Sequence, residues 1–215
     1  MRTYQRIIAG GLVLAGLAGL LGCDKKSTES KEESRRSVAE QTVDIYAGNQ
    51  ISIDAADLDG DGRSDLVIAG TKLGDNGIVE LYTDIQGLKR KIADIPLYAG
   101  GNSGLFGGSG DLEIRLADLN NTGRKDIVVA GTKIGNNGIA EVYVVRNLGE
   151  GNFSEPNLIG SVPVYSGNQV GLAIGDRNAD GKLDVIVAGT KLGNNSVGEV
   201  YSLINQGDGN YSLQE

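Results

Sequence analysis

Three acidic loops of nine residues contain the side chains of this chain that are best suited to binding a metal ion. They read DLDGDGRSD at 57–65, DLNNTGRKD at 118–126 and DRNADGKLD at 176–184. In each loop, oxygen-bearing side chains stand at positions 1, 3, 5 and 9, with Gly at position 6 and a basic residue at position 7. Such alternation lets a tight turn direct several hard oxygen ligands at one cation such as Ca²⁺. The predicted ligands, which include the backbone carbonyl at position 7, are Asp57, Asp59, Asp61, Arg63 and Asp65 in the first loop, Asp118, Asn120, Thr122, Arg124 and Asp126 in the second, and Asp176, Asn178, Asp180, Lys182 and Asp184 in the third.

The residues after each loop distinguish it from an EF-hand, whose loop has twelve residues, ends with a bidentate Glu and continues into a helix. Here position 12 is Ile68, Val129 or Val187. The closing Asp is followed by LVIAG, IVVAG or VIVAG, runs that are typical of buried strands. We therefore predict up to three structural calcium ions, each joining two strands. The first loop has four carboxylates, the third three and the second two, so calcium affinity is predicted to fall in that order.

Composition excludes several kinds of chemistry. The chain of 215 residues has no His and a single Cys, which is predicted below to be lipidated, so it offers neither a His/Cys zinc site nor a His or Cys catalytic residue. Its formal net charge of −8 argues against nucleic acid and anionic lipid surfaces as partners of the folded part.

The N-terminus has the pattern of a bacterial export signal. Arg2 and Arg6 precede an apolar stretch that ends at Gly22 and is shorter than a membrane-spanning helix. The sequence LLGC at 20–23 resembles the lipobox of bacterial lipoproteins, which implies lipidation of Cys23 and a membrane anchor facing the periplasm or the cell surface. A plain secretory signal or an uncleaved anchor is the alternative. We predict a signal peptide at 1–22, the lipidated Cys with a flexible polar linker at 23–42, and a folded domain at 43–215.

The folded domain contains one repeat three times. Each unit opens with a tyrosine-glycine turn (YAGNQ, YAGGNS or YSGNQ), followed by an apolar strand, the acidic loop and a second strand. GTKLGDNG, GTKIGNNG or GTKLGNNS then leads into a third strand. A glycine-rich turn precedes a fourth strand, and this turn is degraded to DIQGLKRK in the first unit. Four strands per unit at a period of about 60 residues predict an all-β domain of β-propeller-type blades. The three approximate units are 43–97, 98–164 and 165–215.

These repeats resemble the FG-GAP and VCBS repeat family, which occurs in integrin alpha-subunit heads and in many exported bacterial proteins. DLDGDGRSDLVIAG is similar to the calcium-loop-plus-strand signature of that family, and NLGEGNFS and NQGDGNYS are similar to its glycine-rich turn. Propellers typically have four to eight blades, so three blades predict an incomplete propeller or one closed by oligomerisation. A homodimer could close a six-bladed ring. An open three-blade unit and closure by a partner chain are the alternatives.

The face opposite the acidic loops is the predicted ligand-binding face. Alternate loops of an up-and-down blade fall on opposite faces, so the tyrosine-glycine turn and the GTK loop share this face. The family resemblance points the same way, because integrin ligands bind opposite the calcium loops. Polar side chains repeated here either bind a glycan or protein ligand or simply form turns. They are Asn49, Lys72, Asn76, Asn102, Lys133, Asn137, Asn168, Lys191 and Asn195.

A second repeated feature is interpreted as structural. Glu80, Glu141 and Glu199 each precede a Tyr by two residues, and we read them as a polar stripe that pairs with the lysines rather than as catalytic carboxylates.

Three functions fit these observations. The leading hypothesis is a calcium-stabilised, membrane-tethered extracytoplasmic module that binds a glycan or protein ligand. The alternatives are a structural or assembly subunit of an envelope complex and a polysaccharide-degrading enzyme, since the resemblance extends to such enzymes. No unique acid–base cluster interrupts the repeat, so we predict no catalytic residue and no enzyme activity.

Overall fold

The computed structural model of the chain describes residues 42–43, 45, 50–98 and 111–214. The chain divides into two compact units, Met1–Gln41 and Thr42–Glu215, and the described residues belong to the second. The predicted signal peptide, Cys23 and all of the predicted linker except Thr42 lie outside the described residues. Within the described part, no helix has the length and apolar character needed to cross a membrane.

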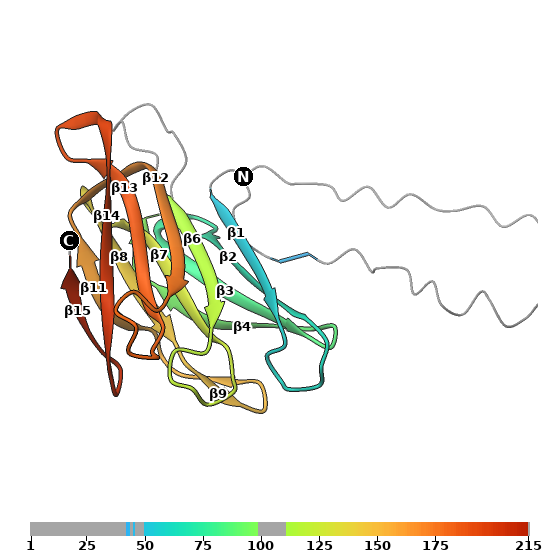
Figure 1. The fold of residues 1–215 in the computed structure, drawn as a ribbon. Coiled ribbons are helices and arrows are strands. Elements are labelled where there is room, and N and C mark those ends of the chain that lie inside the picture. Colours follow the sequence, from blue (N-terminus) through green and yellow to red (C-terminus); the bar gives the residue numbers. More distant parts are fainter. Residues whose placement is uncertain (1–41, 44, 46–49, 99–110, 215) are drawn as a thin grey trace, which may run out of the picture. The chain divides into compact units, whose positions relative to one another are not determined.

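Every regular element in the described residues is a β-strand, which confirms the predicted all-β class. The strands form three antiparallel sheets, here called blades 1, 2 and 3 (Figure 1), and one short hairpin. Blade 1 consists of β1 (Ile51–Ala56), β2 (Asp65–Lys72), β3 (Asp75–Ile85) and β4 (Leu88–Ile95). Blade 2 consists of β5 (Leu97–Tyr98), β6 (Leu112–Ala117), β7 (Asp126–Lys133), β8 (Asn136–Val145) and β11 (Asn157–Val162), and the hairpin of β9 (Asn147–Gly149) and β10 (Asn152–Phe153) follows β8. Blade 3 consists of β12 (Val164–Gly175), β13 (Asp184–Lys191), β14 (Asn194–Gly207) and β15 (Asn210–Gln214).

Each blade is four strands wide, as the repeat predicts. In blade 2, β5 and β6 both pair with β7 and share one of its edges. In blade 3, the single strand β12 occupies both places, with an irregularity between Tyr165 and Val170.

The burial of residues in the second strand shows which faces of each blade are covered. In β7 the first seven residues are all buried, as expected for a strand enclosed on both faces. In β2, Val67 and Ala69 are fully buried whereas the alternate residues Leu66 and Ile68 are only partly buried. Because successive side chains point to opposite faces, blade 1 has one covered face and one outer face. Blade 3 also has one covered and one outer face, since Val185 and Val187 are fully buried whereas Ile186 and Ala188 are only partly buried.

Two apolar cores join the blades. The first core contains residues of blades 1 and 2, among them Leu81 and Val129. The second contains residues of blades 2 and 3, among them Val142 and Val187. The domain is therefore held together mainly by apolar contacts between the faces of successive blades.

A glycine in each GTK segment receives an apolar side chain from the segment that enters the blade. A Cβ atom added to any of these glycines would come within 3.1 Å of the incoming side chain. The pairs are Ile45 over Gly70, Leu97 over Gly131 and Val164 over Gly189. Close packing therefore explains why the repeat has Gly at this position in the middle of a strand.

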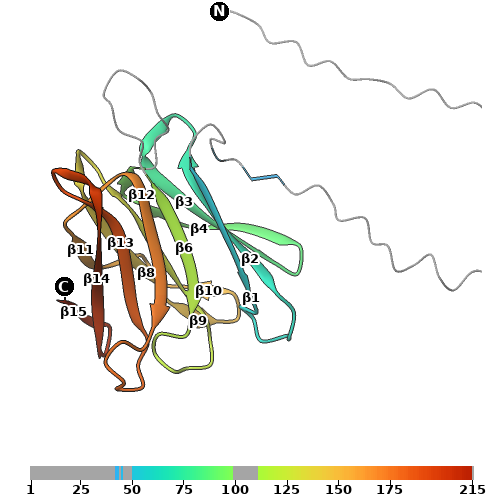
Figure 2. The same ribbon diagram turned by 45° about the horizontal axis from the view of Figure 1, so that its top comes forward.

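The strand order places two kinds of loop at opposite ends of the blades. The acidic loops join first and second strands, and two-residue hairpins join second and third strands at the other end, where Lys72 pairs with Asp75. Figures 1 and 2 show the three acidic loops along one edge of the domain. This arrangement agrees with the predicted up-and-down order.

Candidate metal centre

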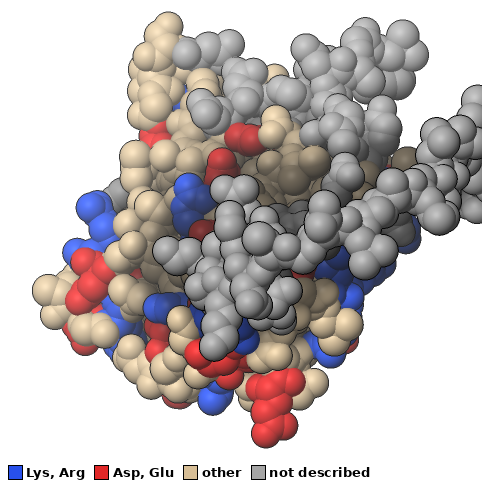
Figure 3. Space-filling view, turned by 90° about the vertical axis from the view of Figure 1, so that its right-hand side faces the viewer, with Lys and Arg blue, Asp and Glu red and all other residues tan. Residues whose placement is uncertain are grey.

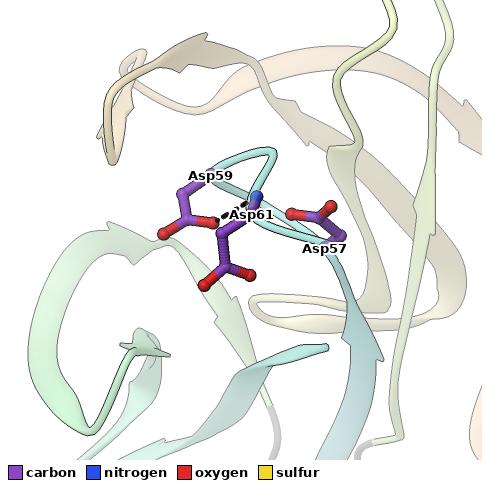
Figure 4. A group of neighbouring side chains, drawn as sticks. All are labelled: Asp57, Asp59 and Asp61. Carbon is purple, nitrogen blue, oxygen red and sulfur yellow. Dashed lines mark hydrogen bonds between the residues drawn. The ribbon is translucent and has the colours of Figure 1, made fainter. Parts of the chain in front are cut away.

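Three carboxylates of the first acidic loop converge. One carboxylate oxygen from each of Asp57, Asp59 and Asp61 lies within 4.8 Å of the others. Figure 4 shows the three side chains gathered at the bend of the loop, where the Asp61 N–H also donates to Asp59 Oδ1 at 3.1 Å. Two oxygens on opposite sides of a Ca²⁺ ion are about 5 Å apart, so this donor set fits calcium in both spacing and chemistry.

Hydrogen bonds within each acidic loop fix its bend. Asp57 Oδ2 accepts the N–H of Gly62 at 2.8 Å. The same bond from position 6 to position 1 recurs at Asp118 (2.7 Å) and at Asp176 (2.9 Å). The position-6 glycines have φ angles of 83°, 81° and 83°, a left-handed conformation that favours Gly. The hydrogen bonds and the left-handed glycine of each loop therefore form its bend.

Position 4 of each loop is also left-handed, but its residue type varies. Gly60, Asn121 and Ala179 have φ angles of 88°, 55° and 59°. Gly adopts this conformation freely and Asn adopts it fairly readily, whereas the Cβ of Ala is strained there. The third loop therefore holds backbone strain that the first does not.

We expect Ala179→Gly to raise the free energy of unfolding by about 1 kcal/mol, because Gly relieves the left-handed strain. Urea denaturation at saturating calcium measures the change. Asn121→Gly, at the matching position of the second loop, is the control and is expected to gain less. An equal gain at both positions would contradict strain at Ala179 as the cause.

In the second and third loops, the side chains at positions 3 and 5 hydrogen bond to each other. Thr122 Oγ1 donates to Asn120 Oδ1 at 2.8 Å, and Asn178 Nδ2 donates to Asp180 Oδ2 at 3.2 Å. Among the described residues, only the first loop brings three carboxylates together. The first loop is therefore the best-formed candidate for a calcium site.

Basic side chains at position 7 contact the carboxylate at position 5. Arg63 donates to Asp61 Oδ2 from Nε at 3.0 Å and from Nη2 at 2.7 Å. Lys182 Nζ donates to Asp180 Oδ2 at 2.7 Å. These hydrogen bonds hold the pKa of Asp61 and that of Asp180 below the usual range of Asp. Both carboxylates are thus anionic at neutral pH, and a bound cation would compete with the basic side chain for them.

The closing Asp of each loop is buried. The exposed fractions of Asp65, Asp126 and Asp184 are 5 %, 0 % and 0 %. Asp65 Oδ2 accepts the N–H of Leu58 at 2.9 Å, and Asp184 Oδ2 accepts the N–H of Arg177 at 2.8 Å. The structure does not group Asp65 with the three converging carboxylates. These closing residues were predicted as ligands, and the structure shows each in a hydrogen-bonding role that the loop pattern did not indicate.

In blade 2 the closing Asp is part of a connection to blade 1. Asp126 Oδ1 accepts the N–H of Asn147 at 2.9 Å, and Asp126 Oδ2 accepts from Arg146 Nη1 at 2.8 Å. Asn147 Nδ2 in turn donates to the carbonyl of Leu58, in the first acidic loop, at 2.9 Å. We call the chain of hydrogen bonds from Asp through Asn to the preceding loop the inter-blade clasp.

The inter-blade clasp recurs between blades 3 and 2. Asp184 Oδ1 accepts the N–H of Asn205 at 2.8 Å, and Asn205 Nδ2 donates to the carbonyl of Leu119 at 2.9 Å. The sequence interpretation missed this role. The signal that could have revealed it is an Asn six residues after the repeated Glu in the second and third units, where the first unit has Gln86.

Two of the three repeated glutamates pair with the lysines predicted for the polar stripe. Glu141 pairs with Lys133 at 3.1 Å, and Glu199 pairs with Lys191 at 3.0 Å. In blade 1, Glu80 pairs with Lys91 at 2.7 Å rather than with the predicted Lys72. Hydrogen bonds to Asp94 and then to Glu80 raise the pKa of Lys91 well above the usual Lys value.

A buried tyrosine lies beside this stripe. Tyr143 donates from its hydroxyl to Glu141 Oε2 at 3.3 Å, and burial, with a smaller contribution from the negative charge of Glu141, raises the pKa of Tyr143 to about 12. The tyrosine therefore stays a neutral donor to the glutamate throughout the physiological pH range.

The structure describes only part of the predicted ligand-binding set. Asn49 and Asn102 lie outside the described residues, as do the side chains of Asn168 and Asn195. Asn76 and Asn137 already interact within the protein. Lys133 and Lys191 are held in the ion pairs of the stripe. Lys72 differs from them, because the corresponding Glu80 pairs with Lys91.

One part of the chain matches the model of a known protein family. Residues 118–187 match the model of a family described as the FG-GAP-like repeat. The chain carries an FG-GAP-like repeat. This finding confirms the resemblance to FG-GAP repeats noted in the sequence. The FG-GAP-like match runs from the first Asp of the second acidic loop into β13, and so includes the third acidic loop as well.

Two curated relatives are similar over a longer stretch than the FG-GAP-like match. Integrin alpha-IIb of Homo sapiens is 30 % identical over 154 residues, and integrin alpha-IIb of Mus musculus is 29 % identical over 154 residues. Each alignment covers 66 % of this chain, which spans 14 % of the length of these relatives. No solved structure matches the chain.

Proposed function

We propose that this protein is a calcium-stabilised, extracytoplasmic binding module, tethered to a bacterial membrane through Cys23. The observation that carries the proposal is the convergence of Asp57, Asp59 and Asp61 in a chain with an FG-GAP-like repeat. Three negative charges held this close repel one another, and a bound Ca²⁺ ion would relieve that repulsion. The similarity to integrin alpha-IIb supports an exported binding role. The tether rests on the LLGC sequence at 20–23.

The residues of the first loop would link the ion to the packing of the blades. Asp57, Asp59 and Asp61 would hold the ion between β1 and β2. Leu58, which lies among them, offers its carbonyl to Asn147 of blade 2. An ordered first loop therefore also supports the contact between blades 1 and 2, so the ion serves the fold rather than a reaction.

Ligand binding is assigned to the opposite end of the blades, with a glycan or a protein segment as the ligand. Lys72 is the basic residue best placed to contact it, because its counterparts are engaged with Glu141 and Glu199. A glycan array probed with the calcium-loaded chain tests this assignment. A hit that Lys72→Ala abolishes supports it, and a hit that Lys72→Ala leaves intact contradicts it.

Removing calcium is expected to lower the melting temperature by about 5–10 °C. A ligand at one hundred times its Kd stabilises a protein by about 2.7 kcal/mol. Each kcal/mol shifts the melting temperature of a domain of this size by about 2–4 °C. Scanning fluorimetry of the full chain in detergent, with calcium and then with EDTA, measures the difference.

Two variants locate the calcium effect. Asp61→Asn removes one of the converging carboxylates and should reduce the difference between calcium and EDTA. Glu155→Gln removes an exposed carboxylate outside the acidic loops and should leave it unchanged. Identical melting in calcium and EDTA, for protein shown by atomic absorption to have contained calcium, would overturn the structural role of the ion.

A role in assembly is the second candidate function. It is favoured by the outer faces of blades 1 and 3, which expose large apolar side chains such as Ile53 (58 %) and Val200 (55 %). Recovery of one stoichiometric envelope partner after cross-linking would support assembly as the main role.

A further inference from the structure

The outer faces of blades 1 and 3 keep the apolar pattern that the inner faces use to pack. On the outer face of blade 1, Ile68 occupies the position in β2 that Val129 occupies in β7, and Val129 is part of the first core. On the outer face of blade 3, Ala188 occupies the position in β13 that Ala130 occupies in β7, and Ala130 is part of the second core. In Figure 3, which shows the side of the molecule near β1, acidic and basic groups are interspersed and form no field of one sign in the visible described part. Each outer face is thus suited to contact another blade.

Asp84 is the strongest indication that blade 1 contacts another molecule. It stands in β3 at the position where blade 2 has Val145 and blade 3 has Leu203, each part of the core shared with the preceding blade. Only 4 % of Asp84 is exposed, and its Oδ2 has no hydrogen-bond partner in the described part of the chain. Lys89, directly opposite on β4, donates to the carbonyl of Thr42. A buried carboxylate oxygen without a donor is costly, so a donor from outside the described residues is expected.

The matching position on blade 3 carries the opposite charge. Leu58 and Leu119 occupy position 2 of the first and second acidic loops and are buried in the cores that hold the counterparts of Asp84. The third loop has Arg177 at this position, exposed and without an ion pair within the described residues. If blade 3 of one copy is stacked on blade 1 of another as successive blades stack within the chain, Arg177 lies beside Asp84.

We propose that two copies of this chain associate head to tail, with the outer face of blade 1 on the outer face of blade 3 of the second copy. Asp84 of each copy accepts hydrogen bonds from Arg177 of the other. Each copy offers both faces, so two copies form two identical contacts related by two-fold symmetry. The resulting six blades lie within the range of closed propellers.

Exchanging the two charges tests the proposal. The full chain in detergent, studied by light scattering with separate absorbance and refractive-index detection, should have twice the protein mass of one chain. Asp84→Arg and Arg177→Asp each place like charges at both contacts and should weaken dimerisation at least about tenfold. An equimolar mixture of the two variants restores an acid–base pair at both contacts, so the mixture should dimerise again.

The mixture also controls for folding, because a variant that failed to fold could not be rescued by a second variant. Glu155→Arg changes an exposed charge outside both faces and should leave the dimer intact. A monomeric parent chain at every concentration would overturn the proposal. So would single variants that dimerise as strongly as the parent, or a mixture that stays monomeric.

Discussion

Asp126→Ala is expected to lower the free energy of unfolding by about 3–5 kcal/mol, as the loss of one partner of a buried ion pair usually does. Asp126 is fully buried and accepts from Arg146 Nη1 at 2.8 Å and from the N–H of Asn147 at 2.9 Å. Its removal leaves a guanidinium that is 21 % exposed without its acceptor. It also releases Asn147, whose side chain holds the carbonyl of Leu58. Chemical denaturation followed by circular dichroism measures the loss.

Two matched substitutions separate the causes of this loss. Asp184→Ala removes the acceptor of the second inter-blade clasp, where Ile204 takes the place of Arg146 and no ion pair is lost. Asp65→Ala removes an acceptor for the N–H of Leu58. The expected order of destabilisation is Asp126, then Asp184, then Asp65. Equal losses at Asp126 and Asp184 would contradict the importance of the pair with Arg146.

The inter-blade clasp gives the calcium site a consequence beyond its own loop. The first acidic loop presents both the converging carboxylates and the carbonyl of Leu58 that Asn147 binds. A cation that orders this loop therefore also fixes an acceptor for the next blade. For this reason, Asn147→Ala should reduce the stabilisation by calcium as well as the stability of the metal-free protein.

The repeat made much of the fold predictable. Strands alternate with loops at a fixed period, so the runs LVIAG, IVVAG and VIVAG were correctly assigned to second strands, of which only β7 is buried on both faces. The degraded turn at Gln86-Gly87 still forms a two-residue hairpin, since both residues have positive φ angles, as Asp208 and Gly209 have in blade 3. Local turn chemistry and apolar periodicity are visible in sequence because they depend on neighbouring residues.

The contacts between blades were harder to predict, because they join residues far apart in the chain. Asn147 reaches the carbonyl of Leu58, 89 residues earlier, and only the three-dimensional stacking of blades reveals that bond. The closing Asp residues were assigned to a cation by the loop pattern, which gave no sign that they also accept backbone N–H groups. Departures from the repeat, such as Asp84 and Arg177, can be interpreted only when the structure shows which faces of the blades are outer faces.

Gly189→Ala is expected to lower the free energy of unfolding by about 2–3 kcal/mol, because it overpacks the entry to blade 3. A Cβ at residue 189 would lie 2.7 Å from Val164 Cβ and 2.8 Å from Val164 Cγ2. Val164 is fully buried, and its Cβ cannot move away by rotation of the side chain. The entering end of β12 must therefore shift away from β13, which breaks the pairing of Val164 with Lys191. Denaturant unfolding of the calcium-loaded protein measures the loss.

Gly70→Ala is the matched control, since Gly70 has the same place in blade 1. The closest atom to a Cβ at residue 70 is Ile45 Cδ1 at 2.6 Å, the far end of a flexible side chain that can turn aside. The Cβ of Ile45 would lie 3.2 Å from the added Cβ, a distance that requires only a small adjustment. The expected loss is below about 1 kcal/mol. Gly70→Ala costing as much as Gly189→Ala would contradict this difference and would mean that Ile45 is held as rigidly as Val164.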